Sequence, residues 1–178
     1  MKEYFVDEIK NKKVYDNFIQ YMLEHSDFFS VVYFRNRKDS PLNKYLKNYK
    51  KALRPYILHA ENTRKWPNTE TWDGRSVYRI AFYYADMECY DILTRVNDIF
   101  EWHYPRAPMD LCFYKNGYCW FALTAHEEMA YLYTDNDRDA EALRNLGLEV
   151  TYTEDNAQVF YYDLTKEMNH YRTKRPNQ

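Results

Sequence analysis

The apolar residues of this chain recur at two spacings, which predict helices in some segments and strands in others. Over residues 10–25 they recur about every three to four positions, the spacing of one helix face, and Ser26 ends the segment. A second helical pattern runs over 39–53, and its apolar face consists of Leu42, Tyr45, Leu46, Tyr49 and Leu53. Ser40 suits the N-cap of that helix and Pro41 its first turn, because the cap accepts a backbone hydrogen bond and proline lacks a donor that is unpaired there.

Uninterrupted runs of β-branched and aromatic residues predict buried strands at 28–35 and 76–85. Residues 54–76 lie between a helix and the second strand, and they contain two prolines and two tryptophans. They predict a long irregular loop in which Tyr56–His59 can form a short strand, and long loops often carry function. Residues 86–102 return to the helical spacing, with Asp86 as the expected N-cap.

The stretch DLCFYKNGYCWF, residues 110–121, predicts a β-hairpin. Asn116 and Gly117 favour a two-residue type I′ turn, because both central positions of that turn need a positive φ angle. Pairing outward from the turn matches Lys115 with Tyr118, Tyr114 with Cys119, Phe113 with Trp120 and Cys112 with Phe121. Side chains alternate along a strand, so one face carries Cys112, Tyr114, Cys119 and Phe121 and the other Leu111, Phe113, Trp120 and Ala122. Both faces are apolar, which predicts a central position in a sheet.

Shorter patterns follow the hairpin. Residues 127–135 predict a strand, and 135–148 predict a helix with an aspartate as N-cap and Gly147 as its C-terminal stop. The basic segment 166–178 shows no clear pattern and is expected to be a flexible tail. Two closing strands are expected, at 149–153 and 158–164.

Together these elements predict an α+β fold, an antiparallel or mixed β-sheet with about four helices packed on it, in a single domain over residues 1–165. A parallel doubly wound sheet needs regular alternation of strands and helices, which residues 110–135 break. The composition, with 46% hydrophobic and 29% charged residues in 178, suits one folded domain rather than a disordered chain.

The cysteines predict packing rather than chemistry. Cys112 and Cys119 are diagonal neighbours in the predicted hairpin, roughly 7–8 Å apart, whereas a disulfide spans at most about 6.8 Å between Cα atoms. The chain has no C-x2-C pair to grip a zinc ion, and the sequence HEEMA after the hairpin lacks the second histidine of a metalloprotease helix. We therefore expect two buried small side chains, no metal and no cofactor.

The sequence also predicts where the protein acts. No apolar run approaches the roughly 20 residues that span a bilayer, and the N-terminus lacks the apolar stretch of a signal peptide. Three cysteines without an export signal suit the reducing cytoplasm. The Lys-, Asn- and Tyr-rich composition is typical of a low-GC bacterium or its phage. A cytoplasmic protein without membrane contact is expected.

Charge is distributed unevenly, although the net charge of the whole chain is only −2. Residues 126–163 contain two basic and ten acidic side chains, a net charge of −8. A concentrated acidic surface can steer and hold a basic partner. The candidate partner-binding residues are Asp135, Asp137, Asp139 and Glu141.

The sequence also predicts two alternative functional sites. A histidine beside carboxylates can transfer protons, so a small hydrolase or transferase would use His126, Glu127, Glu128 and Asp110, converging with Trp120 or Tyr114. Basic residues next to aromatic ones can bind single-stranded nucleic acid. That interface would consist of Arg35, Lys44, Lys47, Lys51, Arg54, Trp66 and Trp72, although the sequence pI of about 6.2 is low for this class.

The hairpin DLCFYKNGYCWF, the following HEE and the LGL helix end resemble a group of small uncharacterised proteins of Gram-positive bacteria and their mobile elements. The resemblance covers about a quarter of the chain and implies no activity, because none is established for the group. The function that we expect is therefore protein binding, for example by an immunity protein or inhibitor that neutralises a toxin or defence enzyme through its acidic surface. A His126–carboxylate enzyme and a nucleic-acid-binding protein are the alternatives.

Overall fold

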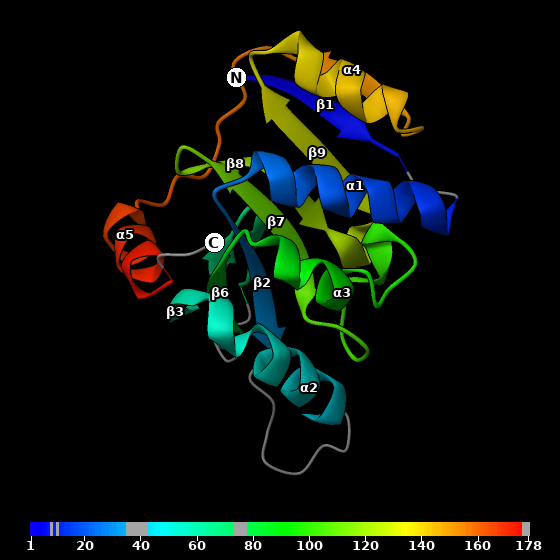
Figure 1. Cartoon of the computed structure of the whole chain (residues 1–178). Coiled ribbons are helices and arrows are strands. Elements are labelled where there is room, and N and C mark those ends of the chain that lie inside the picture. The colour runs from blue at the N-terminus through cyan, green and yellow to red at the C-terminus, as the bar shows by residue number, and fades with distance from the viewer. Residues whose placement is uncertain (8, 10, 35–42, 73–77, 176–178) are drawn as a thin grey trace.

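A computed structural model describes residues 1–7, 9, 11–34, 43–72 and 78–175, and its centre is one large antiparallel sheet (Figure 1). Within the described residues the sheet has eight strands, and each pair of neighbours is antiparallel. Their spatial order is β10 (Val150–Glu154), β1 (Lys2–Val6), β9 (Met129–Thr134), β8 (Tyr118–Thr124), β7 (Met109–Lys115), β2 (Phe28–Phe34), β6 (Tyr78–Tyr84) and β3 (Ile57–Thr63). The predicted α+β class is confirmed.

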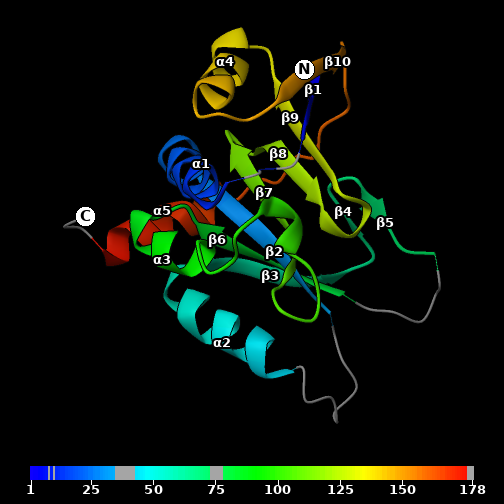
Figure 2. The same cartoon turned by 90° about the vertical axis from the view of Figure 1, so that its right-hand side faces the viewer.

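Helices cover one face of the sheet, and a small hairpin with part of the C-terminal chain covers the other (Figure 2). The described helices are α1 (Lys12–His25), α2 (Asn43–Leu53), α3 (Tyr90–Leu93), α4 (Asp137–Asn145) and α5 (Thr165–Lys174). Single 3-10 turns occur at Arg54–Tyr56, Met87–Cys89, Ile99–Glu101 and Ala125–Glu127. The small hairpin consists of β4 (Lys65–Trp66) and β5 (Thr69–Glu70). None of the described helices is long and apolar enough to cross a membrane.

Helix α1 forms where the apolar spacing predicts it. The side chain of Asn11 accepts a hydrogen bond from the Lys13 backbone N–H at 2.8 Å and thereby caps the helix start. Phe18, Ile19 and Met22 are fully buried against the sheet. Burial of each such side chain contributes about 1.5–3 kcal/mol, so this face fixes the helix to the sheet.

Helix α2 also agrees with its predicted apolar face in part. Leu46, Tyr49 and Leu53 are buried, whereas Tyr45 is 55% exposed. The predicted N-cap, the first-turn proline and Leu42 lie outside the described residues.

The turn of the predicted hairpin is confirmed, and its register differs by one residue beyond Cys119. Asn116 and Gly117 have φ angles of 53° and 81°, as a type I′ turn requires. Phe113 pairs with Phe121 instead of Trp120, because β8 contains a bulge at this point. Phe121 consequently lies on the helix-covered face with Trp120, and Ala122 lies on the other face with Cys112 and Cys119.

Other segments differ more from the sequence prediction. In the described part of the predicted loop, residues 54–72, the short strand expected at Tyr56–His59 is the longer β3, which extends the main sheet, and β4 and β5 form the small hairpin. Only the first part of 86–102 is helical. The side chain of Asp86 caps it as predicted, but the Asp98 side chain accepts a hydrogen bond from the Phe100 backbone N–H at 2.6 Å and starts a separate 3-10 turn.

The two chain ends contain structure that the pattern does not predict. Strand β1 is inserted between β9 and β10. The segment 158–164 makes only an isolated bridge between Tyr161 and Tyr118 instead of a strand. Residues 165–174 form α5 rather than a flexible tail, and its Tyr171 ring stacks on Tyr84 with 4.5 Å between centroids. The N-cap of α4 is Asn136 and not an aspartate, while Gly147 ends that helix as predicted, with a φ of 101°.

Candidate functional site

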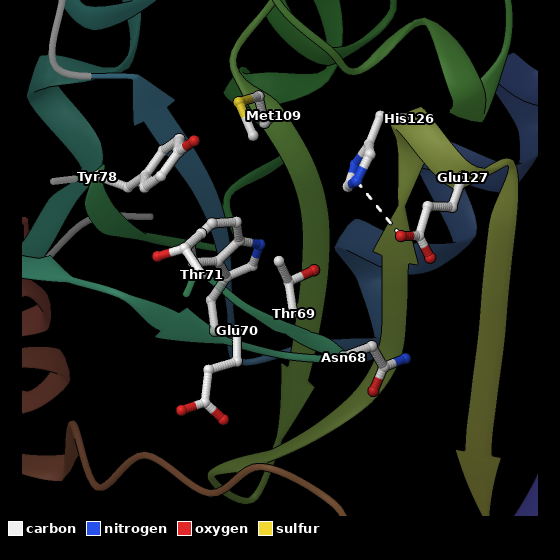
Figure 3. Close-up of a pocket in the computed structure, with 9 residues that line it drawn as sticks. Asn68, Thr69, Glu70, Thr71, Tyr78, Met109, His126 and Glu127 are labelled. Carbon is white, nitrogen blue, oxygen red and sulfur yellow. Dashed lines mark ion pairs between the residues drawn. The ribbon is translucent and has the colours of Figure 1, made fainter. Parts of the chain in front are cut away.

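A cavity of about 360 Å³ lies between the β4–β5 hairpin and the turn that follows β8 (Figure 3). The volume falls in the range of about 300–1,000 Å³ that is usual for small-molecule sites. His126 and Glu127 approach the cavity from one side, and Tyr78 and Met109 lie on the other. The complete lining consists of Trp66, Asn68, Thr69, Glu70, Thr71, Tyr78, Met109, His126 and Glu127.

A buried carboxylate, Asp110, holds the segments around this cavity together. Its Oδ2 atom accepts a hydrogen bond from the Trp66 indole N–H at 2.7 Å, and its Oδ1 atom accepts one from the Ala125 backbone N–H at 2.9 Å. Asp110 is only 1% exposed. It therefore links the small hairpin to β7 and to the 3-10 turn that carries His126.

Burial raises the pKa of Asp110, because an ionised carboxylate loses its hydration inside the protein. The N–H groups of Ala125 and Trp66 and the nearby charge of His126 act in the opposite direction. Glu127 raises the pKa further, as a like charge does. The pKa of Asp110 thus depends on the charges of both His126 and Glu127.

His126 and Glu127 form the polar wall of the cavity. The distance from Nε2 of His126 to Oε1 of Glu127 is 3.6 Å, and both side chains are about half exposed. The two groups can therefore reach a bound molecule and exchange a proton with it. Glu128 follows directly in sequence but lines a different cavity, together with Asp7 and Asp98.

A hydroxyl group inside the site has no partner among the described residues. Oγ1 of Thr69 is buried there without a hydrogen bond, although buried polar atoms almost always have one. The neighbouring Asn68 is different, because its side-chain amide exchanges hydrogen bonds with the Tyr133 hydroxyl at 2.9 and 3.2 Å. Thr69 consequently places an unsatisfied, buried hydroxyl in the wall of the cavity.

Three non-glycine residues in left-handed backbone conformations are part of the lining or follow a lining residue directly in sequence. Asn68, Asp110 and Glu128 have φ angles of 58°, 54° and 53°. This region is uncommon for residues with a side chain. Such conformations concentrate at functional sites, where the surrounding structure holds them.

The sequence-predicted catalytic set is brought together only in part. Asp110, His126 and Glu127 converge, while Glu128 faces elsewhere. The expected partners Trp120 and Tyr114 are wrong. Tyr114 is fully buried and bonded to Ser30, and the Trp120 indole donates to Ser26 on the helix-covered face. Trp66 and Tyr78 take their place, and only pairing of distant segments could have revealed them.

The predicted partner-binding acids belong to two environments. Asp137 accepts hydrogen bonds from the Lys2 ammonium at 2.7 Å and the Tyr4 hydroxyl at 2.6 Å, and Asp139 accepts one from the Thr134 hydroxyl at 2.7 Å. These two carboxylates hold α4 against the sheet. Asp135 and Glu141 are exposed.

The predicted nucleic-acid interface is not a continuous surface. Its three lysines, Lys44, Lys47 and Lys51, are exposed on α2, and Arg54 is exposed at the start of the 3-10 turn that follows, on the helix-covered face. Trp66 is 1% exposed and packs on the opposite face, so it cannot stack on a base beside them. Trp72 is 86% exposed, and Arg35 lies outside the described residues.

Among the described residues, no group of three or more His, Cys, Asp or Glu side chains is arranged to hold a metal ion. Comparison of the chain with family models, curated proteins and solved structures gave no match.

Proposed function

We propose that the protein binds a small hydroxyl- or amine-bearing molecule in the cavity between the β4–β5 hairpin and the turn after β8, which we call the Trp66–His126 cavity. The His126–Glu127 pair is placed to exchange a proton with this molecule. The observation that carries this proposal is the convergence of that pair and the unpartnered Thr69 hydroxyl on one open cavity. A ligand hydroxyl or amine would donate to the half-exposed Glu127 carboxylate, and a small shift of the atoms that cover the Thr69 oxygen would let it bond there as well.

The charge of the cavity selects among ligands. Among the described residues, its lining contains the carboxylates of Glu70 and Glu127, and His126 is the only basic side chain. Glu70 also has a weak ion pair with Lys65 at 3.7 Å. An anionic ligand would meet like charge at Glu127, whereas a neutral or cationic ligand would not. The site therefore favours sugars and amines over carboxylates and phosphates.

Three sugars of one shape test this preference, namely glucosamine, glucose and glucuronate. We expect glucosamine to bind most tightly and glucuronate least, in titrations followed by isothermal calorimetry. Glu127→Gln removes the charge and should weaken glucosamine binding about tenfold, with a smaller effect on glucose. Glu128→Gln is the matched control, because this neighbour lines another cavity. Equal binding of glucuronate and glucosamine would contradict the proposal.

A second candidate function is protein binding through an acidic sheet edge, as an immunity protein or inhibitor would use it. The observation that favours it is the position of β10, which ends the strand order and has no neighbour on its outer side within the described residues. Thr151–Glu154 are exposed, and Tyr152 is 49% exposed. An extended basic segment could add to such an edge as a further strand.

Charge reversal on this edge and on the adjacent helix α4 separates the two candidates. Glu141→Lys and Glu154→Lys change exposed acids without touching the Asp137–Tyr4 contact. If the edge binds a basic partner, both variants should lose a protein that the wild type retains from a host lysate. Glu61→Lys, on the opposite edge strand β3, should keep it. Retention by all variants would exclude the acidic edge.

A further inference from the structure

A second cavity, of about 400 Å³, opens on the helix-covered side of the molecule. One wall is the exposed side of α2, and the other is the segment from Arg95 to Arg106 that follows α3. The residues that it contains are chemically unlike those of the Trp66–His126 cavity. Among the described residues, its lining includes two arginines, two asparagines and two tyrosines, with a single carboxylate.

The two arginines are available to an anion. Arg95 and Arg106 are both exposed, and neither pairs with a carboxylate among the described residues. The Arg95 guanidinium lies 5.7 Å from the centroid of the Tyr49 ring, a cation–π contact that orients it. The lone carboxylate, Glu101, already accepts a hydrogen bond from the Asn97 backbone N–H at 2.8 Å. The cavity therefore carries net positive charge.

An aromatic surface and two amides accompany these cations. The Tyr45 side chain is 55% exposed although it belongs to the predicted apolar face of α2. Asn48 and Asn97 also line the cavity, and each amide supplies both a donor and an acceptor. A planar ring with polar edges could stack on Tyr45 and hydrogen-bond to these amides.

We propose that this cavity binds a nucleoside phosphate, with the base against Tyr45 and the phosphate at Arg95 and Arg106. The guanidinium group is suited to phosphate because its planar fork can form two parallel hydrogen bonds. Aromatic side chains stack on any base. A simple anion would contact only the two arginines, and an uncharged ring would contact only Tyr45 and the asparagine amides, whereas a nucleoside phosphate would contact all of them.

Two sources could supply this chemistry, a free mononucleotide or a nucleotide within a single strand. Lys44, Lys47 and Lys51 are exposed on the same helix α2, and none of them lines the cavity. A strand would contact them and bind in a salt-dependent manner, whereas a mononucleotide would not reach them. Triple substitution of these lysines by Gln separates the two sources.

The test is a set of calorimetric titrations of the full-length protein with adenosine 5′-monophosphate, adenosine, inorganic phosphate and a ten-residue deoxythymidine oligonucleotide. We expect the monophosphate to bind at least about tenfold more tightly than adenosine or phosphate alone, because a charged hydrogen bond contributes that much. Arg95→Gln and Arg106→Gln should each weaken it by a similar factor, and Tyr45→Ala should weaken it less. Arg138→Gln, an exposed arginine on α4, is the matched control.

The outcomes decide the proposal. Loss of binding in both arginine variants, with thermal unfolding temperatures equal to the wild type, supports it. If the oligonucleotide binds more tightly than the monophosphate and this binding weakens in the triple lysine variant, the source is a single strand. If the triple substitution leaves monophosphate binding unchanged and the oligonucleotide binds no more tightly, the source is a free mononucleotide. No measurable monophosphate or oligonucleotide binding at millimolar concentration, or equal binding by the Arg95, Arg106 and Arg138 variants, overturns the proposal.

Discussion

The indole nitrogen of Trp66 lies 2.7 Å from Oδ2 of Asp110, although 44 positions separate the two residues in sequence. This hydrogen bond attaches the β4–β5 hairpin to the main sheet and forms the base of the Trp66–His126 cavity. Because the second oxygen of Asp110 accepts the Ala125 N–H, the same carboxylate also positions the turn of His126. Its removal should therefore affect both stability and the site.

Asp110→Asn tests the structural part of this relationship. Asparagine has only one acceptor oxygen, so its amide N–H₂ would face either the Trp66 or the Ala125 donor. We expect a loss of about 2 kcal/mol in the free energy of unfolding, the usual cost of an unsatisfied buried group, measured by urea denaturation at neutral pH. In a Trp66→Phe background the loss should be smaller, since one donor is gone. Equal losses in both backgrounds would contradict the geometry.

The raised pKa of Asp110 also predicts a pH dependence. Above the ordinary aspartate pKa of 3.8 the unfolded chain has released this proton, whereas the folded protein retains it up to a higher pH. The contribution of Asp110 to stability therefore falls as the pH rises from about 4 through the folded-state pKa, and is constant above it. When wild type and Asp110→Asn are compared by urea denaturation across this range, the stability advantage of the wild type over the variant should decrease as the pH rises. Parallel curves would be inconsistent with the raised pKa.

Gly117 is a position where a side chain is excluded. An added Cβ atom would lie 2.5 Å from Cε2 of Tyr161 and 2.9 Å from the backbone oxygen of Tyr162, and the φ of 81° is itself unfavourable for alanine. We expect Gly117→Ala to cost roughly 1–3 kcal/mol in thermal or urea unfolding. Adding Tyr161→Ala should restore part of that loss, because the ring is one of the two obstacles. No recovery in the double variant would assign the cost to the backbone alone.

The three cysteines should be chemically inert in the folded protein. Cys89, Cys112 and Cys119 are all buried and free, and burial raises the pKa of Cys89 and Cys119 by disfavouring the thiolate. Ellman's reagent should therefore modify none of them in native buffer and all of them after denaturation. A Tyr45→Cys variant provides an exposed thiol for comparison. Rapid reaction of a wild-type cysteine would show that the buried face opens.

Much of this fold could be predicted from local signals. The Asn116–Gly117 turn, the burial of Cys112 and the face of α1 that contacts the sheet depend on nearest neighbours and on residue spacing. The bulge in β8 could not be predicted, because it depends on how β7 and β9 pair with that strand.

Less of the Trp66–His126 site than of the fold could be predicted from the sequence. His126, Glu127 and Asp110 were identified by type, but Trp66 was expected in a loop. Its partner is 44 residues away, and no periodicity connects them. Helix α5 was missed for a related reason, since its sequence is polar and only Tyr171 is buried.

Tyr171 accordingly provides a test of α5. Its ring stacks on Tyr84, and its hydroxyl lies 3.4 Å from Oδ2 of Asp86. Tyr171→Ala should lower the free energy of unfolding by roughly 2–3 kcal/mol, toward the lower end for a large buried side chain. His170→Ala, an exposed neighbour in the same helix, should change it by less than about 0.5 kcal/mol. Equal effects of the two variants would mean that α5 is not docked.

The most direct measurement of ligand binding in the Trp66–His126 cavity follows the Trp66 indole N–H by two-dimensional ¹H–¹⁵N NMR during a glucosamine titration. The chain has four tryptophans, and Trp66→Phe assigns the relevant signal. We predict a saturable shift of this signal in the wild type and in Glu128→Gln, and a titration about tenfold weaker in Glu127→Gln. An unmoved Trp66 signal, or identical titrations of the two glutamate variants, would contradict the proposed site.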